Sequence, residues 1–187
     1  MDTVTAIRSR RTIKDFTGAP VARERVERLL ELAAWAPTHR LTQPWRFACL
    51  DQGGIRRLHD FLKATPEIAA VPDPAKGAAK LAKLGDRLPG LGAMIVVTWV
   101  RAADAAVDLE DHAAAAAAVQ NLLLAATADG LGTFWSTNPA LGHPLTLRFC
   151  GVDPAREGFL GAIFLGEAAE TPSAPPRVPH SERVRWV

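Results

Sequence analysis

The sequence has little cysteine, little net charge and no long apolar run, and each shortage excludes a class of protein. Its 187 residues include only two cysteines, Cys49 and Cys150, which form neither a CxxC pair nor a spacing typical of zinc sites. We therefore expect buried, reduced thiols. The 22 Lys and Arg exceed the 20 Asp and Glu by only two, which is too small an excess for a nucleic-acid-binding surface. Any function that needs positive charge must depend on a local cluster.

We expect neither a membrane span nor an export signal from the sequence. The longest apolar stretch, 113–128, is interrupted by Gln120 and Asn121, and the apolar run at 94–100 is far too short to cross lipid. Near the start, Arg8 comes too early for the apolar core of a signal peptide. We expect a soluble, cytoplasmic protein, which agrees with reduced thiols.

The apolar residues that are present suffice for a single domain covering 1–187. Hydrophobic residues make up 48% of the chain, which can fill a sizeable core, and no internal repeat or linker divides it. The periodicity predicts helices at 2–11, 21–35, 55–64, 112–129 and 145–150, and strands at 45–51, 93–100, 133–136 and 159–165. Strands separated by helices indicate an α+β domain whose helices pack on a sheet.

Two proline-rich segments lie outside this pattern. The segment 65–88 predicts a loop followed by a short exposed helix. The tail at 167–187 predicts an extended arm rather than disorder, because Val184, Trp186 and Val187 are apolar residues that favour burial.

The first candidate site is the stretch RSRRTIKDF at 8–16. Arg10, Arg11, Thr12 and Lys14 place two guanidinium groups, a hydroxyl and an ammonium within a short segment at the end of the first predicted helix. Such a set could bind a phosphate. The alternative is that cations near a helix C-terminus only complement the helix dipole. The stretch alone does not decide between the two.

Two further stretches could recognise a ring. The first, APTHRLTQPWRF at 36–47, holds polar donors that include His39 and Gln43 on a loop stiffened by proline. The second, GLGTFWSTNP at 130–139, combines glycines that permit close backbone approach with a flat ring and hydroxyls. The alternatives are an ordinary helix-to-strand connection and a helix stop followed by a core tryptophan. The candidates in the second stretch are Trp135, Ser136 and Thr137.

Taken together and in order, RRTIKDF, LLELAAWAPTHRLTQPWRF, AMIVVTWV, AAAVQNLLLAATADGLGTFW and LGAIFLGE resemble the nitroreductase family of FMN-dependent oxidoreductases, especially its compact bacterial members. The resemblance implies an α+β fold with a central mixed or antiparallel sheet flanked by helices. It also implies an intertwined homodimer with FMN at the subunit interface. The implied activity is ping-pong, two-electron reduction of nitroaromatics, quinones or similar conjugated acceptors by NAD(P)H. The chemistry would take place on flavin N5, with no catalytic side chain.

The resemblance also implies roles for individual residues. Arg10, Arg11 and Thr12 match the family's arginine-arginine-serine signature at the flavin phosphate and ribityl chain, with Lys14 where an arginine is common. Arg177 matches a tail arginine that adds a second charge at the phosphate. The loop residues His39 and Gln43 match positions that approach the flavin from the neighbouring subunit. The stretch beside the ring and its N5 edge is matched by Trp135, Ser136 and Thr137.

In this sequence some positions depart from the family pattern. Thr12 keeps the hydroxyl of the usual serine, whereas Lys14 offers a point charge in place of a guanidinium fork. Leu41 stands where larger members often have asparagine, and Trp35 where some compact relatives have arginine. The segment 65–88 resembles the variable segment that shapes substrate access in this family.

Other readings of the sequence stay open. A noncatalytic flavin-binding module would hold the cofactor without turnover, and a flavin-fragmenting or dehydrogenating relative would hold it with little NAD(P)H oxidation. A nucleic-acid-binding protein is disfavoured by the charge balance. The histidines lack metal-ligand spacing, so we expect no metal site. The acidic run of Asp108, Glu110 and Asp111 is interpreted as the solvated, capping start of a helix.

Overall fold

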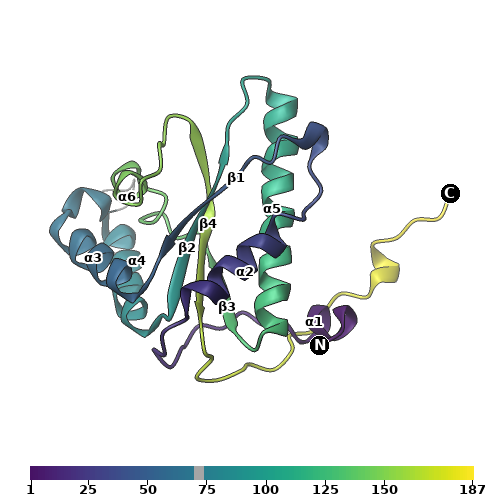
Figure 1. The fold of residues 1–187 in the computed structure, drawn as a ribbon, viewed down its shortest axis with the longest axis horizontal. Coiled ribbons are helices and arrows are strands. Elements are labelled where there is room, and N and C mark those ends of the chain that lie inside the picture. The colour runs from purple at the N-terminus through teal and green to yellow at the C-terminus, as the bar shows by residue number, and fades with distance from the viewer. Residues whose placement is uncertain (70–73) are drawn as a thin grey trace.

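Four strands form one antiparallel sheet with the order β1-β2-β4-β3 in the computed structural model, which describes residues 1–69 and 74–187 (Figure 1). The strands are β1 (Trp45–Leu50), β2 (Ala93–Val100), β3 (Gly132–Ser136) and β4 (Glu157–Gly166). Each pairing between neighbouring strands is antiparallel. The predicted α+β class and the predicted strands are confirmed, and the sheet is antiparallel rather than mixed.

The helices lie close to their predicted places, although several of their ends differ from the prediction. They are α1 (Thr3–Ser9), α2 (Arg23–Ala33), α3 (Gln52–Ala64), α4 (Pro74–Arg87), α5 (Ala105–Ala128) and α6 (Pro144–Phe149), with short 3₁₀ turns η1 (His39–Leu41), η2 (Pro66–Ala69), η3 (Leu88–Gly90) and η4 (His180–Glu182). Helix α1 ends two residues earlier than predicted, and α4, at 14 residues, is not short. Helix α5 starts at Ala105 because Asp104 caps it by accepting from the backbone N–H of Ala106 and Val107.

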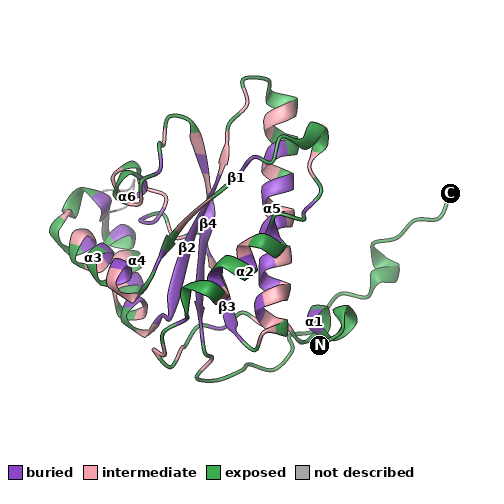
Figure 2. Ribbon diagram, in the orientation of Figure 1, coloured by how far each residue is buried: buried purple, intermediate pink, exposed green. Residues whose placement is uncertain are grey.

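Helices cover both faces of the sheet. On one face α2 and α5 pack against Ile95 and Val97 of β2, and on the other face α3, α4 and α6 pack against Met94 and Val96. The central strands β2 and β4 are therefore buried on both sides (Figure 2). The prediction of a central strand covered on both faces is confirmed.

Helix α5 is the core helix, as predicted from its alanine content. Its buried side chains include Ala115, Ala118 and Ala126, which are fully enclosed between α2 and the sheet. Small side chains let neighbouring elements approach closely, and the larger Val119 and Leu122 fill the remaining space. None of the described helices is long and apolar enough to cross a membrane.

The two cysteines are free, but the prediction that both are buried is wrong for Cys49. Cys49 lies on β1, which is an edge strand and is exposed along one side, whereas Cys150, at the end of α6, is half-buried. Burial raises the pKa of the Cys150 thiol to about 11.

The segment after α1 runs along the outer edge of β3. Thr12 pairs with Thr133 in a parallel bridge, and the N–H of the buried Ile13 donates to the Thr133 carbonyl at 2.9 Å. Gly132 makes this approach possible, because a Cβ at that position would lie 2.8 Å from Cγ1 of Ile13. The basic residues around Thr12 are thus held beside the start of β3.

The C-terminal tail first meets this same segment and then leaves the body of the protein. The N–H of Ala169 donates to the carbonyl of Asp15 at 3.0 Å, and Phe16 pairs with Ala168. Beyond this point the tail is extended and exposed, apart from η4 (Figure 1). The predicted extended arm is confirmed, but the expected burial of its apolar residues is not found within one chain, because Val184, Trp186 and Val187 are all exposed.

Candidate functional site

Five of the ten predicted site residues line one pocket of about 390 Å³ between the segment after α1 and the tail. They are Arg10, Arg11, Thr12, Lys14 and Arg177. We call this the anion pocket. Its remaining wall comes from Asp15 and from tail residues that the sequence analysis did not single out, namely Glu170, Pro172, Ser173 and Pro175. Residues from opposite ends of the sequence therefore meet at one site.

The charge of the anion pocket is positive, because four cationic side chains face two carboxylates, Asp15 and Glu170. Within residues 1–69 and 74–187, the side chains of Arg10, Lys14 and Arg177 have no hydrogen-bond or ion-pair partner. Guanidinium and ammonium groups gathered in this way favour a compact anion such as phosphate, which can accept several of their hydrogen bonds at once.

Arg11 has a different role from its neighbours. Its Nη1 donates to the carbonyl of Arg8 at 2.7 Å and to that of Arg10 at 2.9 Å, at the C-terminal end of α1. The interpretation of the basic stretch as a helix end thus holds for Arg11, which satisfies free carbonyls there. It does not account for Arg10, Lys14 or Arg177, whose charged groups are not used in this way.

The predicted ring-side residues lie farther along β3 from the anion pocket. Ser136 is three positions beyond Thr133, the residue paired with Thr12, so it lies roughly 10 Å along the strand. Ser136 is buried and Thr137 is exposed. Trp135 is half-buried against the α5 side of the core, and its indole N–H donates to the carbonyl of Leu160 at 3.2 Å. Trp135 is therefore a core tryptophan as well as a neighbour of Ser136 on β3 and of Thr137, which follows the strand.

The turn before β3 is also a helix stop, as the alternative interpretation proposed. Gly130 has a φ of 75°, and the N–H of Leu131 donates to the carbonyl of Ala126 at 2.8 Å. The same glycine that ends α5 thus directs the chain into β3, which carries the ring-side candidates.

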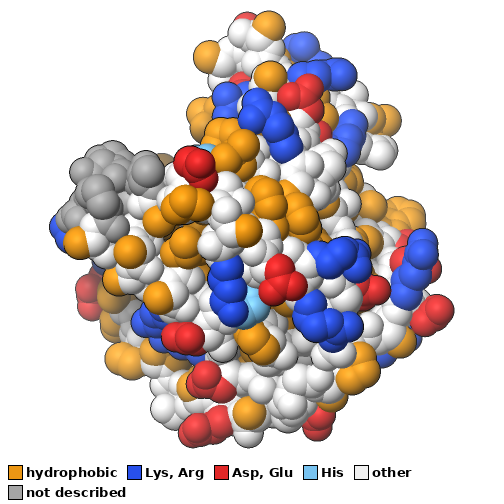
Figure 3. Space-filling view, turned by 90° about the vertical axis from the view of Figure 1, so that its left-hand side faces the viewer, with side chains coloured by type: hydrophobic (Ala, Val, Ile, Leu, Met, Phe, Trp, Pro, Cys, Tyr) orange, Lys and Arg blue, Asp and Glu red, His pale blue; other side chains and the backbone are white. Residues whose placement is uncertain are grey.

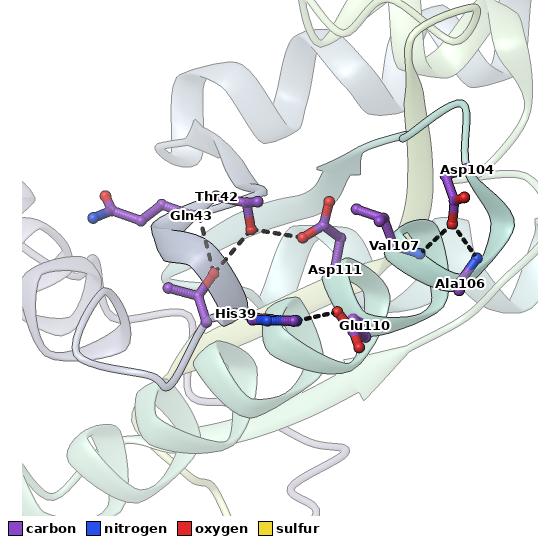
Figure 4. Close-up of polar contacts among 9 residues, drawn as sticks. His39, Thr42, Gln43, Asp104, Ala106, Val107, Glu110 and Asp111 are labelled. Carbon is purple, nitrogen blue, oxygen red and sulfur yellow. Dashed lines mark hydrogen bonds and ion pairs between the residues drawn. The ribbon is translucent and has the colours of Figure 1, made fainter.

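The structure does not bring His39 and Gln43 to the anion pocket within one chain. They lie in the segment 38–43, which we call the polar loop, and this loop packs on the first third of α5 (Figure 4). The anion pocket lies beside β3, which follows the other end of α5. Glu110, which contacts the polar loop, is 19 residues from Asp129 at the end of α5, or about 28 Å along the helix axis.

The contacts of the polar loop correct the interpretation of the acidic run, which lies inside α5 and does not cap it. Asp108 accepts from the indole N–H of Trp99 and from the backbone of Ala102, both at 3.0 Å. Glu110 contacts Nδ1 of His39 at 2.5 Å, and Asp111 accepts from the Thr42 hydroxyl at 2.6 Å. Each carboxylate of the run fixes another part of the fold, so the run is not merely a solvated helix start.

A second and larger cavity of about 830 Å³ lies at the edge of β1 between α2 and α3. Its lining is mostly apolar and includes both cysteines and the ion pair between Arg23 and Glu27. It contains none of the ten predicted site residues. Among the described residues on the face that carries α3 and α4, positive and negative side chains are interspersed and form no continuous field of one sign (Figure 3).

Comparisons with known proteins identify the family of the chain. The model of the nitroreductase family matches residues 7–167. The curated protein named "Putative NAD(P)H nitroreductase YfhC" from Bacillus subtilis is 28% identical over 179 residues, which cover 95% of this chain and 90% of that protein.

Two solved structures are similar along the whole chain. A nitroreductase-like family protein from Bacillus cereus has a TM-score of 0.86 and 26% identity, and the match covers 100% of this chain and 96% of that one. A protein from Desulfovibrio desulfuricans, described as "a putative nitroreductase in complex with fmn", has a TM-score of 0.77 and 31% identity, and the match covers 100% of this chain and 97% of that one.

Proposed function

Because the chain belongs to the nitroreductase family, we propose that it is an FMN-dependent oxidoreductase that takes electrons from NAD(P)H and reduces nitroaromatics, quinones or similar conjugated acceptors. The observation that carries the proposal is the anion pocket, in which Arg10, Lys14 and Arg177 converge without partners of their own among the described residues. Bound FMN would supply the hydride chemistry at its N5 atom, so the residues of the chain serve to bind and orient it.

The residues present suit the parts of FMN. The cations of the anion pocket would hold the phosphate, and the exposed Thr12 would offer its hydroxyl to the ribityl chain. Ser136 and Thr137, roughly 10 Å farther along β3, would lie beside the ring. Fixed donors at that edge would stabilise negative charge on the reduced ring. The proposal requires no side chain as acid or base.

We further propose that the active form is a cytoplasmic homodimer. The polar loop with His39 and Gln43 lies far from the anion pocket of its own chain, so it could reach a flavin only in a second copy. The tail leaves the body with Val184, Trp186 and Val187 exposed, and burial of such residues favours association. These observations support two interface sites in which each copy completes the other.

The absorption spectrum of the purified protein tests the proposal. The protein should be yellow, or become so after FMN is added to the apoprotein, and NADH or NADPH should bleach the flavin band under anaerobic conditions. Addition of a nitroaromatic or quinone should restore the band. A protein that takes up no FMN would contradict the proposal.

The same measurement separates the alternatives. A noncatalytic flavin-binding module would take up FMN but would not be bleached by either nicotinamide. A flavin-fragmenting or dehydrogenating relative would bind FMN with little NAD(P)H oxidation. Light scattering on the holoprotein tests the dimer, for which the expected mass is twice the 20.1 kDa of one chain.

A further inference from the structure

Asp111 stands apart from every other charged side chain of the described residues because it alone is buried, with 6% of its surface exposed. A buried carboxylate is unfavourable unless polar groups compensate it. Asp111 lies in the alanine-rich helix α5, where an apolar residue would pack without this penalty. We therefore expect the buried carboxylate to form hydrogen bonds that stabilise another part of the fold.

That partner is the polar loop, through a chain of hydrogen bonds with a defined direction. The Thr42 hydroxyl donates to Oδ1 of Asp111 at 2.6 Å, so its oxygen is left to accept from the hydroxyl of Thr38, 3.0 Å away. Oγ1 of Thr38 then accepts the backbone N–H of Gln43 at 3.1 Å. The buried carboxylate thus sets the direction of the bond between the two hydroxyls, and the chain of bonds ends at the backbone of Gln43 (Figure 4).

The backbone of the polar loop needs such support. Three residues without the freedom of glycine have left-handed conformations, namely Arg40 with a φ of 54°, Leu41 with 55° and Gln43 with 44°. Side chains clash with the backbone in this region, so it persists only where surrounding contacts enforce it. Asp111 holds the end of the loop through Thr42, and Glu110 holds its start through His39.

The anchored loop turns its remaining side chains outward. Leu41 is 77% exposed, and Arg40 and Gln43 are exposed as well. In Figure 4 the amide of Gln43 points away from the carboxylates of α5. An anchored loop with outward side chains is what a second copy would require in order to meet its flavin with a fixed surface.

We propose that Asp111 is a positioning residue, which acts through Thr42 and Thr38 to fix Gln43 and the strained polar loop in the conformation that contacts the flavin of a second copy. The contact with the flavin rests on the proposed function, whereas the effect of Asp111 on the loop does not. The two parts can therefore be tested separately.

The first test is amide hydrogen exchange of the apoprotein, which needs no flavin. Asp111→Leu removes the acceptor but keeps the branched outline of the side chain, and exchange at Thr42 and Gln43 should become about 10-fold faster or more, as expected for loss of a hydrogen bond to a charged group. Asp111→Asn keeps an acceptor oxygen, so exchange should stay within about 2-fold of the native chain. Asp60→Asn, an exposed position on α3, is the unrelated control.

Thr42→Val is a second variant for the case in which Asp111→Leu misfolds. Thr42 is exposed and Val keeps its shape, so this change should leave the core intact. It should reproduce the faster exchange, and the double variant with Asp111→Leu should add little to either single change. Unchanged exchange in Thr42→Val, or equal effects of Asn and Leu at position 111, would overturn the proposal.

The second test is the affinity of the apoprotein for FMN, measured by flavin fluorescence, together with the visible circular dichroism of the bound ring. Thr42→Val should weaken FMN binding about 3- to 10-fold and alter the dichroism, whereas Asp111→Asn should do neither. Faster exchange with native flavin affinity and dichroism would overturn the link to the flavin. A native chain that binds no FMN would overturn the proposed function, while the exchange data would still decide whether Asp111 fixes the loop.

Discussion

The anion pocket and the polar loop are proposed to meet one cofactor, yet they are built in opposite ways. In the anion pocket, Arg10, Lys14 and Arg177 have no partners among the described residues, and the backbone beside them pairs with β3 through a single bridge at Thr12. In the polar loop the hydroxyls of Thr38 and Thr42 and the ring of His39 are already bonded, and the backbone is strained. The anion pocket therefore offers cations without partners among the described residues, whereas hydrogen bonds hold the polar loop in one conformation.

Replacing Arg10 should have the largest effect on FMN binding, because it removes a cation from the anion pocket. Arg10→Ala should weaken FMN binding by about 10- to 100-fold, the range expected for a charge-assisted hydrogen bond. Riboflavin lacks the phosphate, so its affinity should not change. Fluorescence titration of the apoprotein with each ligand measures both affinities.

The control for this experiment is Arg148→Ala, because Arg148 is an exposed cation on α6 that lies outside the anion pocket. Added salt should weaken FMN binding in the native chain more than riboflavin binding. Equal losses for FMN and riboflavin in Arg10→Ala would show that Arg10 acts on the fold and not on a phosphate.

Filling the space at Gly132 should have the next largest effect, because it displaces the backbone that carries the anion pocket. In Gly132→Ala the new Cβ would lie 2.8 Å from Cγ1 of Ile13, and overpacking of this kind costs about 1–3 kcal/mol of stability. Chemical denaturation measures the loss. The added change Ile13→Ala makes room, so the double variant should lose less than the two single losses together.

Relieving the strain of the polar loop should have the smallest effect and the opposite sign. Leu41→Gly removes a left-handed penalty of about 1–2 kcal/mol but adds backbone entropy to the unfolded chain. The net gain in stability should be about 0–1 kcal/mol by denaturation. Leu109→Gly, at an exposed leucine within α5, should instead lose about 1 kcal/mol. Similar losses at both positions would mean that the left-handed backbone is not strained.

Sequence patterns located the anion pocket better than the polar loop. The motif around Arg10, together with Arg177, predicted residues that the fold does bring together. A local motif can do this because neighbouring residues stay near one another in any fold. The sequence did not predict that Glu170 lines the anion pocket, because a single carboxylate in a proline-rich tail belongs to no periodic pattern or motif.

The contacts of the acidic run with the polar loop could not be predicted from the sequence. Along a helix, Glu110 and Asp111 look like two adjacent surface carboxylates, and nothing in their spacing tells which face is covered. Their partners His39 and Thr42 lie about 70 positions earlier, and the separations are 71 and 69 residues. Only the order of the strands brings that loop onto α5. The strand order itself was not predictable from apolar periodicity, which gives the elements but not their neighbours.

The wall of the anion pocket has a consequence for how the protein matures. The ribosome makes Arg10 before Arg177, which follows 167 positions later. A nascent chain that has already formed strands β1 to β4 and helices α1 to α6 still lacks the tail that closes the pocket. The complete pocket therefore forms only after the sheet, and proteolytic trimming within 170–177 should leave a folded body that binds the proposed anion less tightly.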